Sequence, residues 1–262
     1  MVFSPALANR QRVLAAISTS AMLAEHAARA GEAPAMPEEG PVATEYQGLL
    51  AKLHDDLRTL HGIQSREKKV ELKAKLISAY LPWVRGALAI EDGAVAPQDE
   101  IVVTVFIWAV DIRNWVLAVE LVTHINAHGL TLPERFNRKP GGLLISEMTD
   151  VAINEPGAVN REELVSAAPG EGPGWDMKNE THARYHRAIG EAWAREAEAF
   201  DPAAESAPAG GKAMMIDAAL ASLREAIRLH ANVGVKKLVE QLERDAKKLA
   251  EAAGANADAP KE

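Results

Sequence analysis

The longest apolar run of the chain, Ile101 to Val110, has to be buried in any folded state. Its ten residues are too few to cross a bilayer, because a membrane-spanning helix takes about 20 residues. The run is rich in β-branched residues, so periodicity alone does not decide between a buried strand and a buried helix. We favour a short helix capped by Asp99, because the neighbouring segments have helical spacing and a lone strand would have no partner.

Apolar residues elsewhere recur at spacings of three and four, which is the pattern of amphipathic helices. One such series follows the apolar run, and its members are Trp115, Ala118, Val119, Val122 and Ile125. Gly129 ends this series as a left-handed residue after the helix, and Pro133 follows it. The run and the series together predict a helical hairpin over residues 99–129, with a tight turn near Asp111.

Stretches rich in proline and glycine separate the predicted helices, because neither residue is favoured inside a helix. The expected segments are an N-terminal helix or arm at 1–30, a linker at 31–43, a helical core at 44–153, a variable Gly/Pro-rich region with one helix at 154–211, a C-terminal helical pair at 212–253 and a disordered tail at 254–262. Within them, helices are expected over 5–29, 44–62, 65–81, 83–90, 100–110, 115–128, 143–153, 177–200, 212–231 and 234–253, and residues 156–174 are expected to be irregular. We therefore predict an all-α, multi-helix protein of helical hairpins joined by flexible linkers, whose last pair resembles a tetratricopeptide hairpin.

The chain contains no cysteine, which excludes a disulfide framework, a thiolate zinc site and a cysteine nucleophile. Its N-terminus places Arg10 and Arg12 in a mildly apolar pattern without a long apolar core, unlike a signal peptide. Both features predict a soluble protein that is not exported and has no membrane partner.

A local excess of positive charge lies between Lys52 and Arg85, in a chain whose net charge is −8. Eight bases and four acids give this stretch a net charge of +4; the bases are Lys52, Arg58, Arg66, Lys68, Lys69, Lys73, Lys75 and Arg85. Lys69 and Lys73 are four residues apart, so a helix could offer one basic edge to phosphates. The alternative is a solvated face of ion pairs such as Glu71 with Lys75, and the sequence leaves both interpretations open.

A second basic candidate is the loop at 135–142, where Arg135, Arg138 and Lys139 precede a proline and two glycines. Bases beside glycines can approach a phosphate closely. An ordinary solvent-exposed loop is the simpler interpretation.

Histidines recur in two pairs with helical spacing, His124 with His128 and His182 with His186. Two imidazoles can chelate a metal, but the spacing sets no third ligand and no HExxH motif occurs. Walker A, GxSxG and GxGxxG motifs are absent as well. We therefore predict no catalytic residue, no metal site and no cofactor.

Three stretches resemble one family: SPALANRQRVLAA, YQGLLAKLHDDLRTLHGIQSREKKVELKAKLISAYLPWVRGAL and DEIVVTVFIWAVDIRNWVLAVELVTHINAHGLTLPERFNRKP. Its signatures include LPWV at Leu81–Val84, an acidic residue before an apolar run with Trp108, and HGLTLP at His128–Pro133. The chain resembles the small terminase subunit of peduovirus-like temperate phages. This resemblance implies a helical, ring-forming homo-oligomer in the host cell cytoplasm. It also implies binding to the packaging site on double-stranded phage DNA and regulation of the large ATPase-nuclease subunit.

With this resemblance, the bases become candidate DNA contacts, and the predicted set is Arg10, Arg12, Lys52, Arg58, Arg66, Lys68, Lys69, Lys73 and Lys75. Family members are often described as the endonuclease subunit, so the alternative is a metal-dependent endonuclease that cuts the packaging site itself. That alternative would use Asp99, Glu100 or Asp111, each of which could equally cap or flank the apolar helix. The chain departs from some relatives in lacking a basic C-terminal tail, and residues 154–200 do not match the family pattern.

Overall fold

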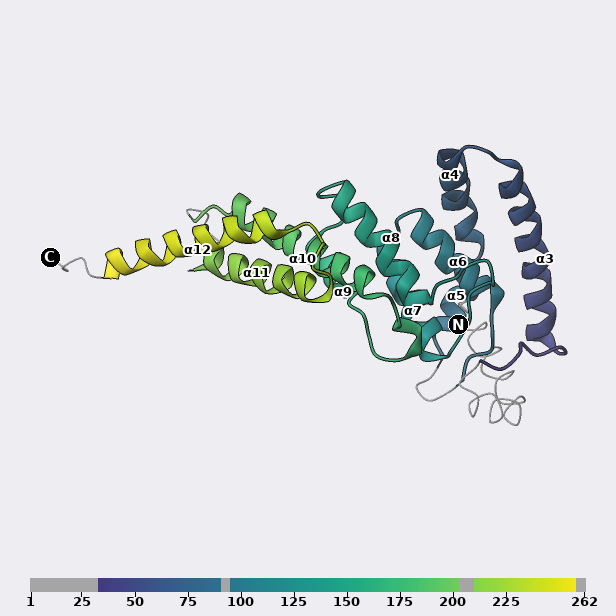
Figure 1. Ribbon diagram of the computed structural model, residues 1–262. Coiled ribbons are helices and arrows are strands. Elements are labelled where there is room, and N and C mark those ends of the chain that lie inside the picture. Colours follow the sequence, from purple (N-terminus) through teal and green to yellow (C-terminus); the bar gives the residue numbers. More distant parts are fainter. Residues whose placement is uncertain (1–32, 91–94, 203–209, 258–262) are drawn as a thin grey trace, which may run out of the picture. The chain divides into compact units, whose positions relative to one another are not determined.

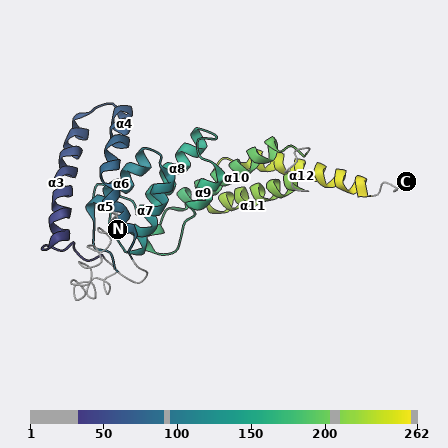
Figure 2. The same ribbon diagram turned by 180° about the vertical axis from the view of Figure 1, so that it is seen from behind.

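The computed structural model describes residues 33–90, 95–202 and 210–257, and every regular element in these ranges is helical (Figures 1 and 2). The all-α prediction is confirmed. The expected helix over 5–29, with Arg10 and Arg12, lies outside the described residues. No helix within the described ranges is both long and apolar enough to span a membrane.

The chain forms two compact units, which are described separately. Unit 1 comprises the described residues of Met1–Leu144 and Gly170–Asp176, and unit 2 those of Ile145–Pro169 and Met177–Glu262. The boundary falls within helix α8 (Pro140–Asn154).

Unit 1 contains five complete helices and two short 3-10 turns, listed in chain order as α3 (Pro41–Gly62), α4 (Arg66–Leu76), η1 (Ile77–Ala79), α5 (Leu81–Leu88), α6 (Glu100–Asp111), α7 (Trp115–Ala127) and η2 (Pro173–Trp175). α3 begins at Pro41, before the expected Thr44, because proline is well suited to the first turn of a helix. Pro82 likewise lies in the first turn of α5, so the chain starts a new helix there after the η1 turn.

Helix α6 is the centre of unit 1 and contacts α3, α4, α5 and α7. All ten residues from Ile101 to Val110 are buried, and the segment is a helix, as predicted, and not the alternative strand. Its start is fixed by Asp99, whose Oδ1 accepts hydrogen bonds from the backbone N–H groups of Ile101 (2.8 Å) and Val102 (3.0 Å). An all-round apolar helix is stable here because other helices surround it.

The predicted hairpin of α6 and α7 is confirmed. Its turn contains Arg113 with a φ of 59°, and Asn114 then caps α7 by accepting from Leu117 N (3.2 Å). Gly129 has a φ of +66°, the left-handed conformation expected after the helix.

Unit 2 contains α9 (Arg161–Ser166), α10 (Asn179–Ala199), α11 (Gly211–Leu229), α12 (Lys236–Ala257) and part of α8. The prediction that residues 156–174 are irregular is wrong, because α9 lies within them and η2 begins there. A capping box starts α9: Asn160 Oδ1 accepts from Glu163 N (2.8 Å), and Glu163 Oε2 accepts from Asn160 N (2.9 Å). This N-x-x-E signal was present in the sequence.

Small residues let α10 and α11 pack closely along their length. A Cβ added to Gly190 would lie 2.6 Å from Leu223 Cγ, and the α10 residues Ala183, Ala188, Ala192 and Ala197 are buried. This packing explains why α10 carries few large apolar residues. α12 packs on α11 and continues to Ala257, past Ala253, where the helix was expected to end. The likeness of the last pair to a tetratricopeptide hairpin stays a prediction.

Candidate nucleic-acid interface

Helix α4 carries most of the bases in the basic stretch, and its start is set by local hydrogen bonds. Ser65 is the N-cap, and its Oγ accepts from Lys68 N (3.3 Å) and donates to Glu67 Oε2 (2.7 Å). The bond from Ser65 lowers the pKa of the Glu67 carboxyl. Glu67 in the first turn and two lysines in the last turn both complement the helix dipole.

No residue of α4 is buried, although the helix contacts α3, α6 and η1. It is held in place by the residues that follow it, Ile77 and Tyr80, which are buried, and by an ion pair between Lys73 and Asp111 at the end of α6. Five bases and two acids give α4 a net charge of +3. Arg66, Lys68 and Lys75 of this charged helix are exposed to solvent, as binding to a polyanion requires.

Four of the bases in this stretch are engaged within the protein. Lys52 contacts Asp56 (2.6 Å) and the hydroxyl of Tyr80 (3.3 Å), and its Nζ lies 4.8 Å from the centre of the Tyr80 ring. The other three are paired as Arg58 with Asp55, Lys73 with Asp111 and Arg85 with Glu120. Tyr80 also donates to Asp56, and burial, followed by this hydrogen bond, raises the pKa of its hydroxyl well above the ordinary value. These contacts reduce the positive charge that the stretch offers to a ligand.

The remaining predicted bases form no ion pair or side-chain hydrogen bond within the described part of the chain, and they are Arg66, Lys68, Lys69 and Lys75. All four belong to α4. Lys68 and Lys75 are exposed and seven residues apart, so they lie on the same side of the helix, about 10 Å apart along its axis. Lys69 and Lys73 are partly buried on the other side. The predicted edge of Lys69 and Lys73 is therefore not the exposed one.

The second basic candidate differs from its expected form, because Pro140 begins α8 and the glycines lie inside a helix. A Cβ on Gly141 would lie 2.3 Å from the indole of Trp175, so this glycine permits close packing against an aromatic ring. Arg135 lies over the Phe136 ring at 5.0 Å. Gly141 thus has a packing role.

The three carboxylates of the endonuclease alternative lie at opposite ends of α6. Asp99 is buried and its Oδ2 accepts from Trp83 Nε1 (2.6 Å), Glu100 faces His54 (3.1 Å), and Asp111 pairs with Lys73. Asp111 lies twelve positions after Asp99, a distance of about 18 Å along the helix. A two-metal site holds its ions about 4 Å apart, so these three side chains cannot form one together.

The predicted histidine pairs do form, with ring centres 4.5 Å apart for His124 and His128 and 5.3 Å for His182 and His186. His128 Nδ1 accepts from Ala96 N (3.3 Å), so this imidazole is neutral and anchors the chain before α6. Burial and the neighbouring His128 lower the pKa of His124 to about 4. Among the described residues, no three His, Asp or Glu side chains gather closely enough to hold a metal ion.

The helical fold with an exposed basic helix defines an all-α protein suited to polyanion contact, and comparison with known proteins gives its family. A family profile described as phage small terminase subunit matches residues 50–167. The chain is also 33% identical over 214 residues to the "Terminase, endonuclease subunit" of Escherichia phage P2, an alignment that covers 78% of this chain and 76% of that protein. No solved structure matches.

The chain therefore belongs to the phage small terminase subunit family. Membership supports a role in phage DNA packaging, and it implies DNA and a large terminase subunit as partners. The profile match includes α4 and the whole hairpin of α6 and α7.

Proposed function

We propose that this chain binds double-stranded phage DNA at the packaging site and recruits the large ATPase-nuclease subunit. The observation that carries the DNA-binding part is the exposed face of α4, where Lys68 and Lys75 stand without ion-pair partners in the described structure. Their separation of about 10 Å along the helix lets two long, flexible side chains reach separate phosphates. Two such lysines can therefore contact phosphates of one strand.

The acidity of the whole chain does not oppose this proposal, because charge acts locally. At physiological salt the Debye length is about 8 Å, so a phosphate at α4 senses the charge of +3 on this helix more than the net −8 of the chain. Elsewhere the negative surface repels DNA, which favours approach through α4.

The other predicted bases are ranked by their partners. Arg66 and Lys69 form no ion pair in the described structure but lie on other sides of α4 than Lys68 and Lys75, whereas Lys52, Arg58 and Lys73 would have to leave Asp56, Asp55 and Asp111. We expect the unpaired set to contribute more to DNA affinity. Arg10 and Arg12 stay predicted contacts outside the described residues.

The test is the salt dependence of DNA binding by the double variant Lys68→Ala/Lys75→Ala. Each lost phosphate contact lowers the slope of log K against log salt by about 0.9, so the double variant should lose about 2 from the slope. The matched control is Lys247→Ala/Lys248→Ala on α12, which removes the same charge from exposed positions of another helix. An unchanged slope in the Lys68/Lys75 variant, or an equal loss in the control, would refute the assignment.

We further propose that the chain works as a homo-oligomeric ring in the host cytoplasm and that its last helical pair, α11 and α12, contacts the large subunit. In a ring every subunit uses two different surfaces, and the interface closes by rotation. The mass of the native assembly in solution tests the ring, because a monomer would contradict it.

The second candidate function is a metal-dependent endonuclease acting at the packaging site, and it is favoured by the name of the relative in Escherichia phage P2, "Terminase, endonuclease subunit". Incubating the purified chain with site-bearing DNA and Mg²⁺, without the large subunit, tests this function directly. Cleavage that is lost in Glu100→Gln would support it. Intact DNA would leave cleavage to the large subunit.

A further inference from the structure

The turn that joins α6 to α7 carries an arginine at a position where glycine is usual. Arg113 N donates to the carbonyl of Val110 (3.1 Å), and Asn114 N donates to the carbonyl of Ala109 (2.9 Å). These two bonds form the Schellman arrangement at the end of a helix, whose left-handed position most often holds glycine. Among the described residues, Arg113 is the one residue other than glycine with a positive φ, which is 59°.

The C-terminal end of α7 has the same arrangement with a glycine in that position. Gly129 N donates to the carbonyl of Asn126 (3.4 Å), and Gly129 has a φ of +66°. Leu130 N supplies the second bond, to the carbonyl of Ile125 (2.9 Å). The left-handed conformation is unfavourable for a residue with a Cβ, and arginine is not one of the residues that tolerate it. Arg113 nevertheless adopts it with its side chain exposed, and residues in such conformations cluster at functional sites.

An ion pair brings this turn to one side of α4. Asp111 lies two positions before Arg113 and pairs with Lys73 of α4, and two residues of chain span at most about 7 Å. Lys69 is one helical turn before Lys73 on the same side of α4, about 6 Å along the axis. Arg66 lies seven positions before Lys73 and faces this side too. The long side chains of Arg66, Lys69 and Arg113, here named the turn-side bases, therefore flank the pair of Lys73 and Asp111.

The positive charge of α4 is concentrated on the side that faces the turn. This side carries the bases Arg66, Lys69 and Lys73, whereas the opposite side carries two bases and two acids, Lys68, Lys75, Glu67 and Glu71. With Arg113 and Asp111 added, the turn side has four bases and one acid, a net charge of +3, and the opposite side has a net charge of zero. A local positive excess attracts a polyanion, and a guanidinium binds phosphate through two parallel hydrogen bonds.

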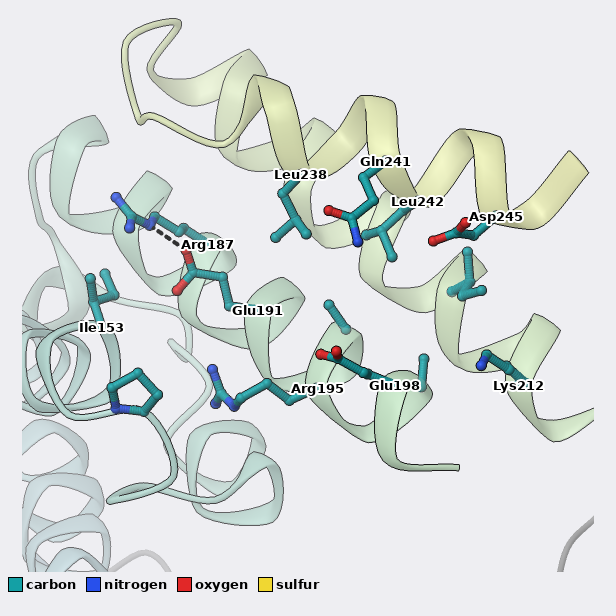
Figure 3. A pocket seen from close by; sticks show the side chains of 14 residues that line it. Ile153, Arg187, Glu191, Arg195, Glu198, Lys212, Leu238, Gln241, Leu242 and Asp245 are labelled. Atoms are coloured by element: carbon teal, nitrogen blue, oxygen red, sulfur yellow. Dashed lines mark hydrogen bonds and ion pairs between the residues drawn. The ribbon is translucent and has the colours of Figure 1, made fainter. Parts of the chain in front are cut away.

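The pocket of unit 2 between α10, α11 and α12 has no such excess of charge (Figure 3). Its lining contains three bases and three acids, Arg187, Arg195, Lys212, Glu191, Glu198 and Asp245. Arg187 is paired with Glu191 (2.8 Å), and Glu198 lies between Arg195 and Lys212 in Figure 3. A polyanion is therefore favoured at the turn side of α4 and not at this pocket.

We infer that Arg113, with Arg66 and Lys69, binds backbone phosphates of double-stranded DNA at the side of α4 that faces the α6–α7 turn. This inference rests on the DNA-binding part of the proposed function and adds a second contact to the one at Lys68 and Lys75. The contact positions the protein on DNA and does not read its sequence, because it is made to phosphates.

The experiment compares Arg113→Gln with Arg113→Lys in the full chain, titrated with site-bearing DNA at several salt concentrations. Both variants keep a long side chain in the turn, but only lysine keeps the charge. We expect Arg113→Gln to lower the slope of log K against log salt by about 0.9, and Arg113→Lys to leave it unchanged. The matched control is Arg244→Gln at an exposed position of α12, which should also leave the slope unchanged. An equal loss in Arg113→Lys or in the control would overturn the inference.

A third variant separates DNA contact from support of the turn. Glycine suits the left-handed conformation, so Arg113→Gly should unfold at the same or a higher urea concentration than the unmodified chain. Its salt slope should fall as in Arg113→Gln. If Arg113 instead stabilises the turn, for example by complementing the negative end of the α6 dipole, Arg113→Gly should unfold at a lower urea concentration. That result would overturn the inference.

The outcomes also separate the inference from the proposed function. Arg113→Gln added to Lys68→Ala/Lys75→Ala should lower the slope by about a further 0.9, because the two contacts are separate. If the unmodified chain does not bind DNA, the proposed function and the inference fail together. If it binds and Arg113→Gln leaves the slope unchanged, the inference alone is wrong. A changed assembly mass in that variant, with an unchanged slope, would assign the turn to a contact between copies of the chain and overturn the inference as well.

Discussion

The strongest test of the core of unit 1 is the replacement of Asp99 by asparagine, which alters one buried group. In the native protein Asp99 is 3% exposed and accepts three hydrogen bonds, from Trp83 Nε1 and from the backbone N–H groups of Ile101 and Val102. Asparagine keeps one oxygen for the two backbone donors, so the cap of α6 can survive. It places an amide N–H₂ where the Trp83 donor needs an acceptor.

Two effects of opposite sign determine the size of the change at neutral pH. A buried donor without an acceptor costs about 1–3 kcal/mol. Burial, however, outweighs the three hydrogen bonds and raises the pKa of the Asp99 carboxyl from 3.8 to about 6, so the charged form costs about 3 kcal/mol at pH 7, at about 1.4 kcal/mol per pH unit. Asparagine removes that cost. We therefore expect the two proteins to differ little in unfolding free energy at neutral pH.

Lowering the pH should then make the unfolding free energies of the two proteins differ. The direction of the pKa shift of Asp99 determines which protein becomes the more stable. Between about pH 4 and pH 6 the folded protein binds the Asp99 proton more tightly than the unfolded chain does, so stability rises as the pH falls. The asparagine variant lacks this proton. The native protein should become more stable than the variant by about 2–3 kcal/mol near pH 4.5, and every other titrating group cancels in the comparison.

Urea unfolding followed by tryptophan fluorescence at about pH 4.5 and about pH 7.5 measures the difference directly. Trp83 contacts Asp99 itself, so its emission reports on the altered site. A native protein that loses stability relative to the variant on acidification would show that hydrogen bonding outweighs burial. That result would refute the reasoning. Asp99→Ala, which also removes the cap, should be less stable than Asp99→Asn at both pH values by about 0.5–2 kcal/mol.

Three further predictions concern stability. Gly190→Ala forces a Cβ to within 2.6 Å of Leu223 Cγ. We expect the variant to lose about 1–3 kcal/mol of unfolding free energy, measured by thermal unfolding followed by circular dichroism. An unchanged unfolding midpoint would contradict the close packing of α10 on α11. Burial lowers the pKa of His124 to about 4, so the native protein should lose stability as the pH falls below about 6.5. His124→Gln should remove part of this loss. Urea unfolding that shows the same loss of stability with falling pH in both proteins would count against this prediction. Asn160→Ala breaks the capping box with Glu163, and it should speed amide exchange in α9 and cost about 0.5–2 kcal/mol; unchanged exchange would show that packing alone holds this helix.

The fold was largely predictable because its main signals are local. The all-round apolar run with an acidic residue before it defined α6, and the series at helical spacing defined α7. Periodicity could not exclude a strand for the run. The helical spacing of the neighbouring segments favoured a helix, and this prediction was correct. α9 was missed although its capping box was readable, because its six residues are too short to show an apolar period.

The candidate interface was predictable as a set of bases but not as a surface. Which lysines remain available to DNA depends on partners far along the chain. Lys73 pairs with Asp111, 38 residues away. Tyr80 contacts both Lys52 and Asp56, and it lies 24 residues after Asp56. Such pairs exist only once the helices are packed, and one sequence does not specify that packing. The exposed pair Lys68 and Lys75 emerged only from the folded arrangement.

The absence of any buried residue in α4 bears on how the DNA-binding proposal can be tested. Substitutions at exposed positions of a helix usually change stability by less than about 0.5 kcal/mol. A loss of DNA affinity in the Lys68/Lys75 variant can therefore be attributed to lost contacts, because the core around α6 is untouched. Lys73→Ala gives the opposite expectation: it breaks the link to Asp111 and should loosen α4, with a smaller effect on the salt slope than Lys68→Ala. If Lys73→Ala proved the more damaging to the slope, the partly buried side of α4, and not the exposed one, would face the DNA.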